Sequence, residues 1–244
     1  MSETSFSPSL EEIWAYEPKT NLLKIKSWEE KGLFHGFQLG LPDLKNKDTT
    51  DWCKLQARSD LHLLKQVHGN RVVDARVDSS NQGLAEADGW FLDQDSAENV
   101  TDSSFGVLSA DCAPVIIFSE QEKSSAILHS GWRGTAKNIL SQGLKKFANA
   151  KNVEIAIGPS AGLCCYEFER ETAERHFKHW LKAEDAYQAG NLSVKKVLEQ
   201  QAIEAGISKD RIFVSQLCSI CDHRFFSFRR QGKDSGRQLS FVGA

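Results

Sequence analysis

Three short segments carry side chains suited to a metal site. They hold His68 in Gln66-Val67-His68-Gly69, Cys112 in Ser109-Ala110-Asp111-Cys112-Ala113-Pro114, and His129 in His129-Ser130-Gly131-Trp132-Arg133-Gly134. One thiolate and two imidazoles form a ligand set that zinc favours, and three protein ligands leave a fourth position for water or substrate. Such an open position is typical of a catalytic rather than a structural zinc site.

The residue types leave a simpler interpretation open. The three side chains are 44 (112 − 68) and 17 (129 − 112) residues apart, so only the fold can bring them together. In the simpler interpretation the histidines are hydrogen-bonded at strand ends, and Cys112 is a small buried hydrophobe. Residue types and spacing alone favour this second interpretation.

The third segment also suits an anion. A strand, a glycine turn and a helix start leave backbone N–H groups unpaired, and Arg133 adds a guanidinium that matches phosphate or carboxylate. An arginine that pairs with a surface acid explains Arg133 equally well. Arg229, Arg230 and Arg237 near the C-terminus offer a further anion clamp, for which a solvated basic edge is the default interpretation.

The remaining cysteines give a weaker signal. Cys218 and Cys221 form a single Cys-x-x-Cys motif. A four-cysteine zinc site needs a second pair, and the adjacent Cys164 and Cys165 have the wrong spacing for one. We therefore expect these cysteines to serve core or turn packing.

The elements that must position these residues are mainly short strands. Runs rich in valine and isoleucine predict strands at 71–77, 89–92, 105–109, 114–119, 125–129, 153–158 and 211–215. Apolar residues at steps of three and four predict helices at 132–148, 169–181 and 193–205. The order predicts an α+β or mixed α/β fold rather than a doubly wound nucleotide-binding fold.

Domain organisation follows from the polar segments. Residues 1–12 are polar, and we expect a flexible tail followed by a single domain over residues 13–244. Polar and turn-forming residues predict loops at 42–51 and 78–83.

Composition excludes several classes of protein. The chain has 244 residues, of which 40% are hydrophobic and 26% charged, as in ordinary globular proteins. A net charge of −3 gives no basic footprint for nucleic acid. The N-terminus lacks the pattern of a signal peptide, and no apolar run approaches a membrane span. Six cysteines without a secretion signal indicate a reducing compartment, so we expect a cytoplasmic protein without a membrane or nucleic-acid partner.

The chemistry-bearing segments resemble the YfiH family, also called the multicopper polyphenol oxidase or laccase-domain family. The matching motifs are residues 66–69, 87–89, 110–115, 129–134, 158–160, 165–167, 225–230 and 236–237. They follow the family's order from residue 60 to the C-terminus, or three quarters of the chain. The N-terminal quarter departs from the pattern, because residues 35–40 contain no arginine where the family has Phe-Ser-Thr-Arg.

The resemblance implies one zinc ion held by His68, Cys112 and His129. It also implies sheets sandwiched by helices, similar to the cysteine-hydrolase-like domain of cytotoxic necrotizing factor toxins. Copper is the less favoured metal, since several coppers need many histidines and the chain has seven, with no His-x-His pair.

The activity implied by the resemblance is purine nucleoside chemistry. Expected reactions are phosphorolysis of adenosine, inosine, guanosine or methylthioadenosine, together with adenosine deamination, so the small-molecule partners are a purine nucleoside and phosphate. Catalytic roles are expected for Cys112, His129, Asp111 as a proton carrier and Arg133 as a phosphate ligand. Substrate contacts are expected from Gln66, Asp88, Trp132, Arg229 and Arg230.

Two other functions use the same residues. In the first, Cys112 is a nucleophile activated by His129, in a hydrolase that cleaves an amide of a muropeptide precursor during peptidoglycan editing. In the second, the protein binds a metal without catalysis. The sequence gives no indication of the oligomeric state.

Overall fold

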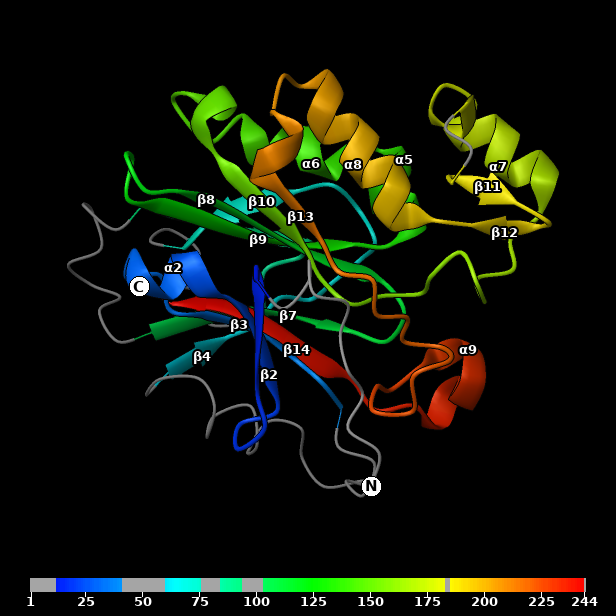
Figure 1. The fold of residues 1–244 in the computed structure, drawn as a ribbon, viewed down its shortest axis with the longest axis horizontal. Helices are drawn as coiled ribbons and strands as arrows, with labels where there is room; N and C mark the ends of the chain where they lie inside the picture. The colour runs from blue at the N-terminus through cyan, green and yellow to red at the C-terminus, as the bar shows by residue number, and fades with distance from the viewer. Residues whose placement is uncertain (1–11, 41–59, 76–83, 94–102, 183–184, 244) are drawn as a thin grey trace.

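Two packed sheets and a layer of helices form the molecule (Figure 1). The computed structural model describes residues 12–40, 60–75, 84–93, 103–182 and 185–243. The predicted loops at 42–51 and 78–83, and the predicted tail except Glu12, lie outside these residues.

The first sheet joins the two ends of the described chain. Its order is β1 (Trp14–Glu17), β2 (Leu22–Ile25), β3 (His35–Gln38), β14 (Gln238–Gly243), β7 (Ser103–Ser109) and β4 (Asp60–His62). The C-terminal strand β14 lies between β3 and β7, with Ser240 opposite both Phe37 and Val107. All pairs are antiparallel except β4 with β7.

The second sheet carries most of the chemistry-bearing segments. Its order is β13 (Ile212–Val214), β10 (Glu154–Ile157), β8 (Ala113–Ser119), β9 (Ser124–Ser130), β6 (Gly89–Asp93) and β5 (Val72–Asp74). Every residue of β8 and β9 is buried. The apolar run of β8, from Ala113 to Phe118, suits a strand covered on both faces.

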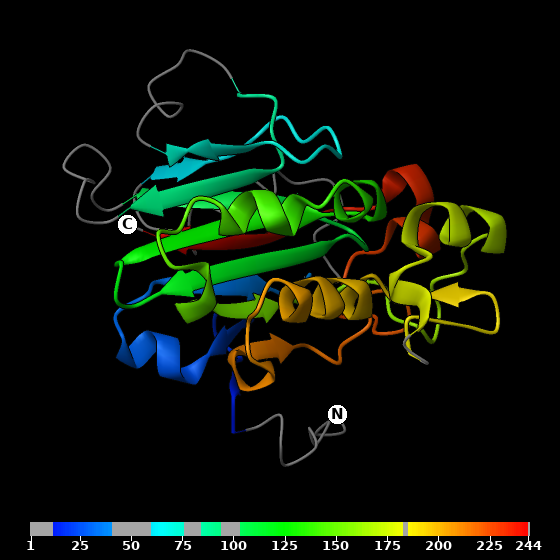
Figure 2. The same ribbon diagram turned by 90° about the horizontal axis from the view of Figure 1, so that it is seen from above.

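Helices cover the outer face of the second sheet (Figures 1 and 2). They are α5 (Trp132–Ala136), α6 (Ile139–Leu144) and α8 (Val194–Glu204). One end of the molecule carries α7 (Arg170–Phe177), the hairpin β11 (Tyr187–Gln188) and β12 (Asn191–Leu192), and α9 (Phe228–Gln231). The short α2 (Lys26–Glu30) follows β2, and single 3₁₀ turns lie at 150–152, 180–182, 209–211 and 232–234.

Two apolar layers hold the elements together. The layer between the sheets includes Phe37, Trp90 and Phe105, all within 2% of full burial. The layer between the second sheet and the helices includes Leu128 and Leu198. Because both sheets contribute to one layer, burial of apolar area stabilises their packing directly.

The structure confirms the predicted mixed α/β class and places a strand in each of the seven predicted ranges. The prediction of one helix over 132–148 is wrong, because α5 and α6 are separated at Asn138, which has a φ of 57°. The predicted helix at 169–181 ends at Phe177, before a 3₁₀ turn. Among the described residues, no helix is long and apolar enough to cross a membrane.

Candidate metal centre

The three predicted metal ligands lie together. His68 lies in the loop between β4 and β5, Cys112 in the turn between β7 and β8, and His129 in β9. One ligand atom from each lies within 4.8 Å of the others. The turn that holds Cys112 passes from the first sheet to the second, so the cluster lies where the two sheets meet. His129 is buried and His68 is exposed, which leaves one side of the cluster open.

Asp88 forms hydrogen bonds with two of these residues, His129 and His68. Its Oδ1 is 2.8 Å from Nδ1 of His129 and also accepts the backbone N–H of His68 at 2.9 Å. Its Oδ2 accepts the N–H groups of Gly69 at 2.7 Å and Val67 at 3.3 Å. Since Asp88 occupies Nδ1, His129 presents Nε2 to the cluster, the arrangement that a carboxylate commonly imposes on a metal-binding histidine.

The backbone around the ligands adopts conformations that side chains rarely take. His68 and Asp111 have φ values of 56° and 88°. A Cβ at Gly131 would lie 2.9 Å from Sγ of Cys112 and 3.2 Å from Cδ2 of His68, so only glycine fits there without displacing a ligand. Strained residues of this kind concentrate at functional sites.

The electrostatics of the cluster favour a thiolate. Burial opposes the charged form of Cys112, but the neighbouring His129 and His68 outweigh it and lower its pKa to about 6. Burial likewise opposes the charged form of His129, yet Asp88 and Cys112 raise its pKa to about 9. Metal ligation requires a deprotonated thiol, so the donor set and its surroundings fit a bound zinc ion.

A cavity of about 540 Å³ opens beside the ligands. Three arginines line it, namely Arg133, Arg229 and Arg237. Asp111 is the only acidic residue among the lining residues, and its carboxylate accepts hydrogen bonds from Oγ of Ser219 and the backbone N–H of Arg229, both at 2.7 Å. The cavity therefore offers positive charge to an anion.

Aromatic rings hold two of these guanidinium groups. The Arg133 guanidinium lies 4.2 Å from the ring centroid of Trp132, and that of Arg229 lies 4.7 Å from the ring of Tyr166. Such stacking fixes a cation without neutralising it. Within the described part of the chain, the Arg133 side chain has no acidic partner at salt-bridge distance.

The other predicted substrate contacts occupy different places. Trp132 and Arg229 line the cavity, whereas the Gln66 amide, although part of the lining, is bonded to the backbone N–H and C=O of Leu108 at 2.7 and 2.8 Å. Asp88 is fully buried and lies outside the lining. Arg230 also lies outside it, and its guanidinium donates to backbone carbonyls of residues 219, 220 and 225.

Tyr166 and Arg237 also line the cavity. Tyr166 is absent from the site residues expected from the sequence, and a solvated edge is the default interpretation for Arg237 there. The signal for Tyr166 was its place in the Cys-Tyr-Glu motif at 165–167. Of the remaining cysteines, Cys218 is buried, whereas Cys164 and Cys221 lie exposed in turns, so core packing does not apply to these two.

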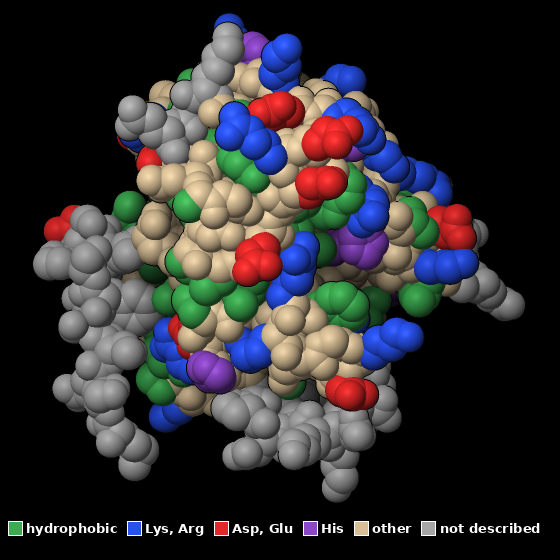
Figure 3. Space-filling model, turned by 90° about the vertical axis from the view of Figure 1, so that its right-hand side faces the viewer, with side chains coloured by type: hydrophobic (Ala, Val, Ile, Leu, Met, Phe, Trp, Pro, Cys, Tyr) green, Lys and Arg blue, Asp and Glu red, His purple; other side chains and the backbone are tan. Residues whose placement is uncertain are grey.

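A larger hollow of about 1180 Å³ lies beside α7. Its walls include two ion pairs along the helix, one between Arg170 and Glu174 and one between Arg175 and Glu171. Figure 3 shows acidic and basic side chains interspersed over this end of the molecule. Neither of the two side-chain clusters among the described residues that could hold a metal ion lies in this hollow, so the smaller cavity is the candidate site.

The fold and site define a mixed α/β protein with a His–Cys–His cluster, able to hold a metal ion, at the meeting of its two sheets. A family model described as multi-copper polyphenol oxidoreductase laccase matches residues 45–244. The chain therefore belongs to this family, which includes the YfiH proteins.

Several relatives are named for nucleoside chemistry. The chain is 28% identical over 204 residues to purine nucleoside phosphorylase CA_C1699 of Clostridium acetobutylicum, covering 80% of each chain. It is 30% identical over 201 residues to adenosine deaminase RL5 of an unknown prokaryotic organism, covering 75% of this chain and 74% of that protein. The crystal structure of YlmD from Geobacillus stearothermophilus has the same fold, with a TM-score of 0.78 at 22% identity, over 95% of this chain and 98% of that one.

Proposed function

We propose that the protein is a zinc-dependent purine nucleoside phosphorylase that also deaminates adenosine. The observation that carries the proposal is the cluster of His68, Cys112 and His129 opening into a cavity with three arginines. The names of the relatives supply the reaction and the substrate class.

His68, Cys112 and His129 would hold the zinc ion. When bound, zinc supplies a Lewis acid with an open coordination position. Multicopper chemistry is poorly supported, since the described residues offer only two histidines at this centre. Asp88 would keep His129 in the tautomer that ligates through Nε2.

The arginines would bind phosphate. Arg133 is exposed at the cavity and rests on Trp132, so its guanidinium is held in place with its donors free for a bidentate contact. Arg229 and Arg237 extend the same charge along the wall. Positive groups fixed before substrate binds stabilise the charge of phosphate and of the transition state.

Asp111 has a less direct role than proton transfer. Both carboxylate oxygens already accept hydrogen bonds, from Ser219 and from the N–H of Arg229. We therefore infer that Asp111 positions the Arg229 segment against the cavity. Tyr166, which also lines the cavity, supports the Arg229 guanidinium through its ring.

Incubation of purified, metal-analysed protein with adenosine tests the proposal. With phosphate we expect adenine and ribose 1-phosphate from phosphorolysis, and inosine and ammonia from deamination. Without phosphate, only deamination should remain. The proposal would be overturned if adenosine underwent neither reaction and inosine, guanosine and methylthioadenosine were not cleaved either.

The substitution His129→Ala tests the role of the metal. We expect loss of both the zinc of this centre and adenosine turnover, because the buried ligand and its Asp88 contact disappear together. His179→Ala is the matched control, since His179 is exposed, pairs with Glu204 and does not line the cavity. Full turnover by a folded His129→Ala protein that lacks zinc at this centre would exclude a metal mechanism.

A second candidate function is favoured by one observation. Asp88, His129 and Cys112 lie in the order acid, base and nucleophile, with a lowered pKa for Cys112. This arrangement suits a cysteine hydrolase that cleaves an amide, such as one in a muropeptide precursor. Amide hydrolysis by the zinc-free protein, abolished by alkylation of Cys112, would establish it in place of the phosphorylase.

A further inference from the structure

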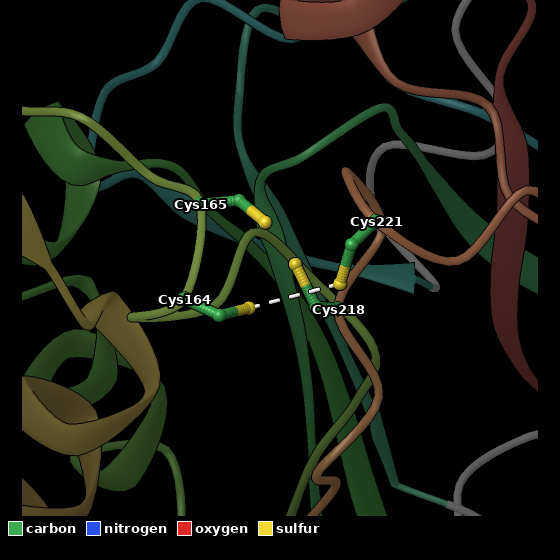
Figure 4. Close-up of side chains that lie close together, drawn as sticks. All are labelled: Cys164, Cys165, Cys218 and Cys221. Carbon is green, nitrogen blue, oxygen red and sulfur yellow. Dashed lines mark hydrogen bonds between the residues drawn. The ribbon is translucent and has the colours of Figure 1, made fainter.

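Four cysteine sulfurs converge on one point away from the His–Cys–His centre. Cys164 and Cys165 lie in a turn after β10, and Cys218 and Cys221 lie in a turn after β13. Since β10 and β13 are neighbouring parallel strands, both turns follow strand ends that lie at the same end of the sheet. The four side chains point toward one another (Figure 4), and all their Sγ atoms lie within 4.8 Å of each other.

The spacing of the sulfurs matches a tetrahedral metal site. With a Zn–S distance of about 2.3 Å, the sulfurs of a regular tetrahedron are about 3.8 Å apart. The Sγ atoms of Cys164 and Cys221 are 3.7 Å apart. A disulfide instead requires about 2.05 Å between its sulfurs. The arrangement is therefore that of four separate thiol ligands.

The surroundings of Cys218 suit a thiolate ligand. Its Sγ accepts the backbone N–H of Gly162 at 3.2 Å and is also bonded by the backbone N–H groups of Ile220 and Cys221. Hydrogen bonds of this kind stabilise the negative sulfur of a metal-bound cysteine. They come from both turns, so the backbone is already folded around this sulfur.

A buried cation lies beside the cluster. Lys195 is 6% exposed, and its Nζ donates to the carbonyls of Ser215 and Leu217, each at 2.8 Å. These carbonyls belong to the segment that leads into Cys218. A zinc ion with four thiolates carries a net charge of −2, so a buried ammonium nearby offsets part of that charge.

We propose that Cys164, Cys165, Cys218 and Cys221 bind one zinc ion in a structural tetrathiolate site. Binding converts four thiols to thiolates and releases four protons, with no change in oxidation state. Four protein ligands leave no position for substrate, so this ion has a structural role.

A metal ion bound by these cysteines would hold in place one wall of the cavity beside the His–Cys–His centre. Tyr166, which lines the cavity, follows Cys165 directly, and Ser219, which follows Cys218, donates to Asp111 at the cavity. Backbone pairing between Ser160 and Cys218 already joins the two turns. A bound ion adds a covalent-like link between them and limits the movement of both residues.

Metal content measured without substrate tests the site independently of the proposed function. We expect two zinc ions per chain in the full protein purified under reducing conditions. One should remain in His129→Ala and one in the double variant Cys164→Ser with Cys221→Ser. The control Cys53→Ser, at a position outside the described residues, should keep both.

Cobalt substitution identifies the ligands. Four thiolates give intense sulfur-to-cobalt charge-transfer absorption, which His129→Ala should retain and the double cysteine variant should largely lose. If the double variant does not fold, the single variant Cys164→Ser, changed at an exposed side chain, should weaken this absorption and lower zinc affinity.

Three outcomes would overturn the proposal. They are a zinc content that is the same in the wild-type protein and in the double cysteine variant, a disulfide among these cysteines in the reduced preparation, and an iron signature in place of zinc. Unchanged cobalt absorption in Cys164→Ser would also exclude Cys164 as a ligand.

Discussion

At the scale of single residues, one buried carboxylate organises the candidate metal centre. Asp88 fixes the ring of His129 and the backbone of residues 67–69 at the same time. It therefore positions two ligands that are 61 residues apart in the chain (129 − 68). Such outer contacts orient a ligand and raise its basicity.

Replacing Asp88 with Asn should weaken zinc binding. We expect a loss of about 10- to 100-fold in affinity, because the amide cannot accept from His129 and from the loop with the strength of a carboxylate. Competition with a chromophoric chelator measures the effect. Asp74→Asn is the control, since Asp74 pairs with Lys146 at the surface. Unchanged affinity in Asp88→Asn would show that this support is dispensable.

The zinc-free protein should contain a reactive Cys112. Its thiol, with a pKa of about 6, should be alkylated half-maximally near pH 6, whereas an ordinary cysteine reacts at a pH well above 7. Mass spectrometry of the Cys112 peptide after timed iodoacetamide treatment measures the profile. In His129→Ala the midpoint should rise, because an imidazolium partner is lost. A midpoint that stays near pH 6 in that variant would assign the shift to another group.

The grouping of the three candidate ligands was predictable from the sequence, but the contacts of several neighbouring residues were not. His68, Cys112 and His129 stand in motifs whose order resembles a family, and these motifs select two histidines out of seven. Gln66 and Asp88 stand in the same motifs, yet their partners are Leu108 and His129, which only the strand arrangement brings near. A motif marks a position, while the contact made there depends on the fold.

At the scale of elements, pairings distant in sequence account for most differences from prediction. The strand β3 has only four residues and gains its neighbour β14 from the opposite end of the described chain. Local alternation is too short there to indicate a strand. The broken helix has a similar cause, because Gln201 of α8 donates to the Thr135 carbonyl and to Oδ1 of Asn138 at the break. Asn tolerates the left-handed conformation, so the tertiary bonds prevail over the helical pattern.

The start of α2 depends on a buried neutral histidine. Nε2 of His35 accepts the backbone N–H of Ile25, and Nδ1 lies 2.9 Å from the Leu33 carbonyl, to which it donates. Burial lowers the pKa of His35 to about 4, against 6.5 for a free side chain. The unfolded chain therefore takes up this proton first as the pH falls. The stabilising contribution is complete above pH 6.5 and decreases between pH 6.5 and 4.

His35→Gln should reduce the acid sensitivity of folding. Between pH 7.5 and 5 the wild-type protein should lose about 2 kcal/mol of unfolding free energy through this residue alone, a contribution that glutamine lacks. Urea unfolding of both proteins at the two pH values measures the difference, and all other titrating groups cancel in the comparison. Equal pH dependence in the two proteins would show that His35 does not titrate as described.

At the scale of the whole molecule, both candidate metal sites lie at connections between strands rather than within a sheet. The His–Cys–His centre lies where the chain crosses from one sheet to the other, and the four cysteines lie beyond one edge of the second sheet. The packed sheets therefore act as a rigid support whose loops carry the chemistry. This arrangement requires the two sheets to keep a fixed separation.

Gly158, directly after β10, is in close contact with a side chain of the first sheet. A Cβ there would lie 2.5 Å from Cε1 of Phe37 in the first sheet and 2.9 Å from Cγ of Pro114, which precedes Val115 in β8. Gly158→Ala should therefore destabilise the protein by about 1–3 kcal/mol through overpacking. Urea unfolding measures the cost, and the variant Phe37→Leu, which removes the ring, provides the second arm of a double-mutant cycle. The double variant should lose less unfolding free energy than the sum of the losses in the two single variants, because the smaller leucine leaves room for the new methyl group. Simple additivity would mean that the sheets are free to separate at Gly158 and that the cavity is held by other contacts.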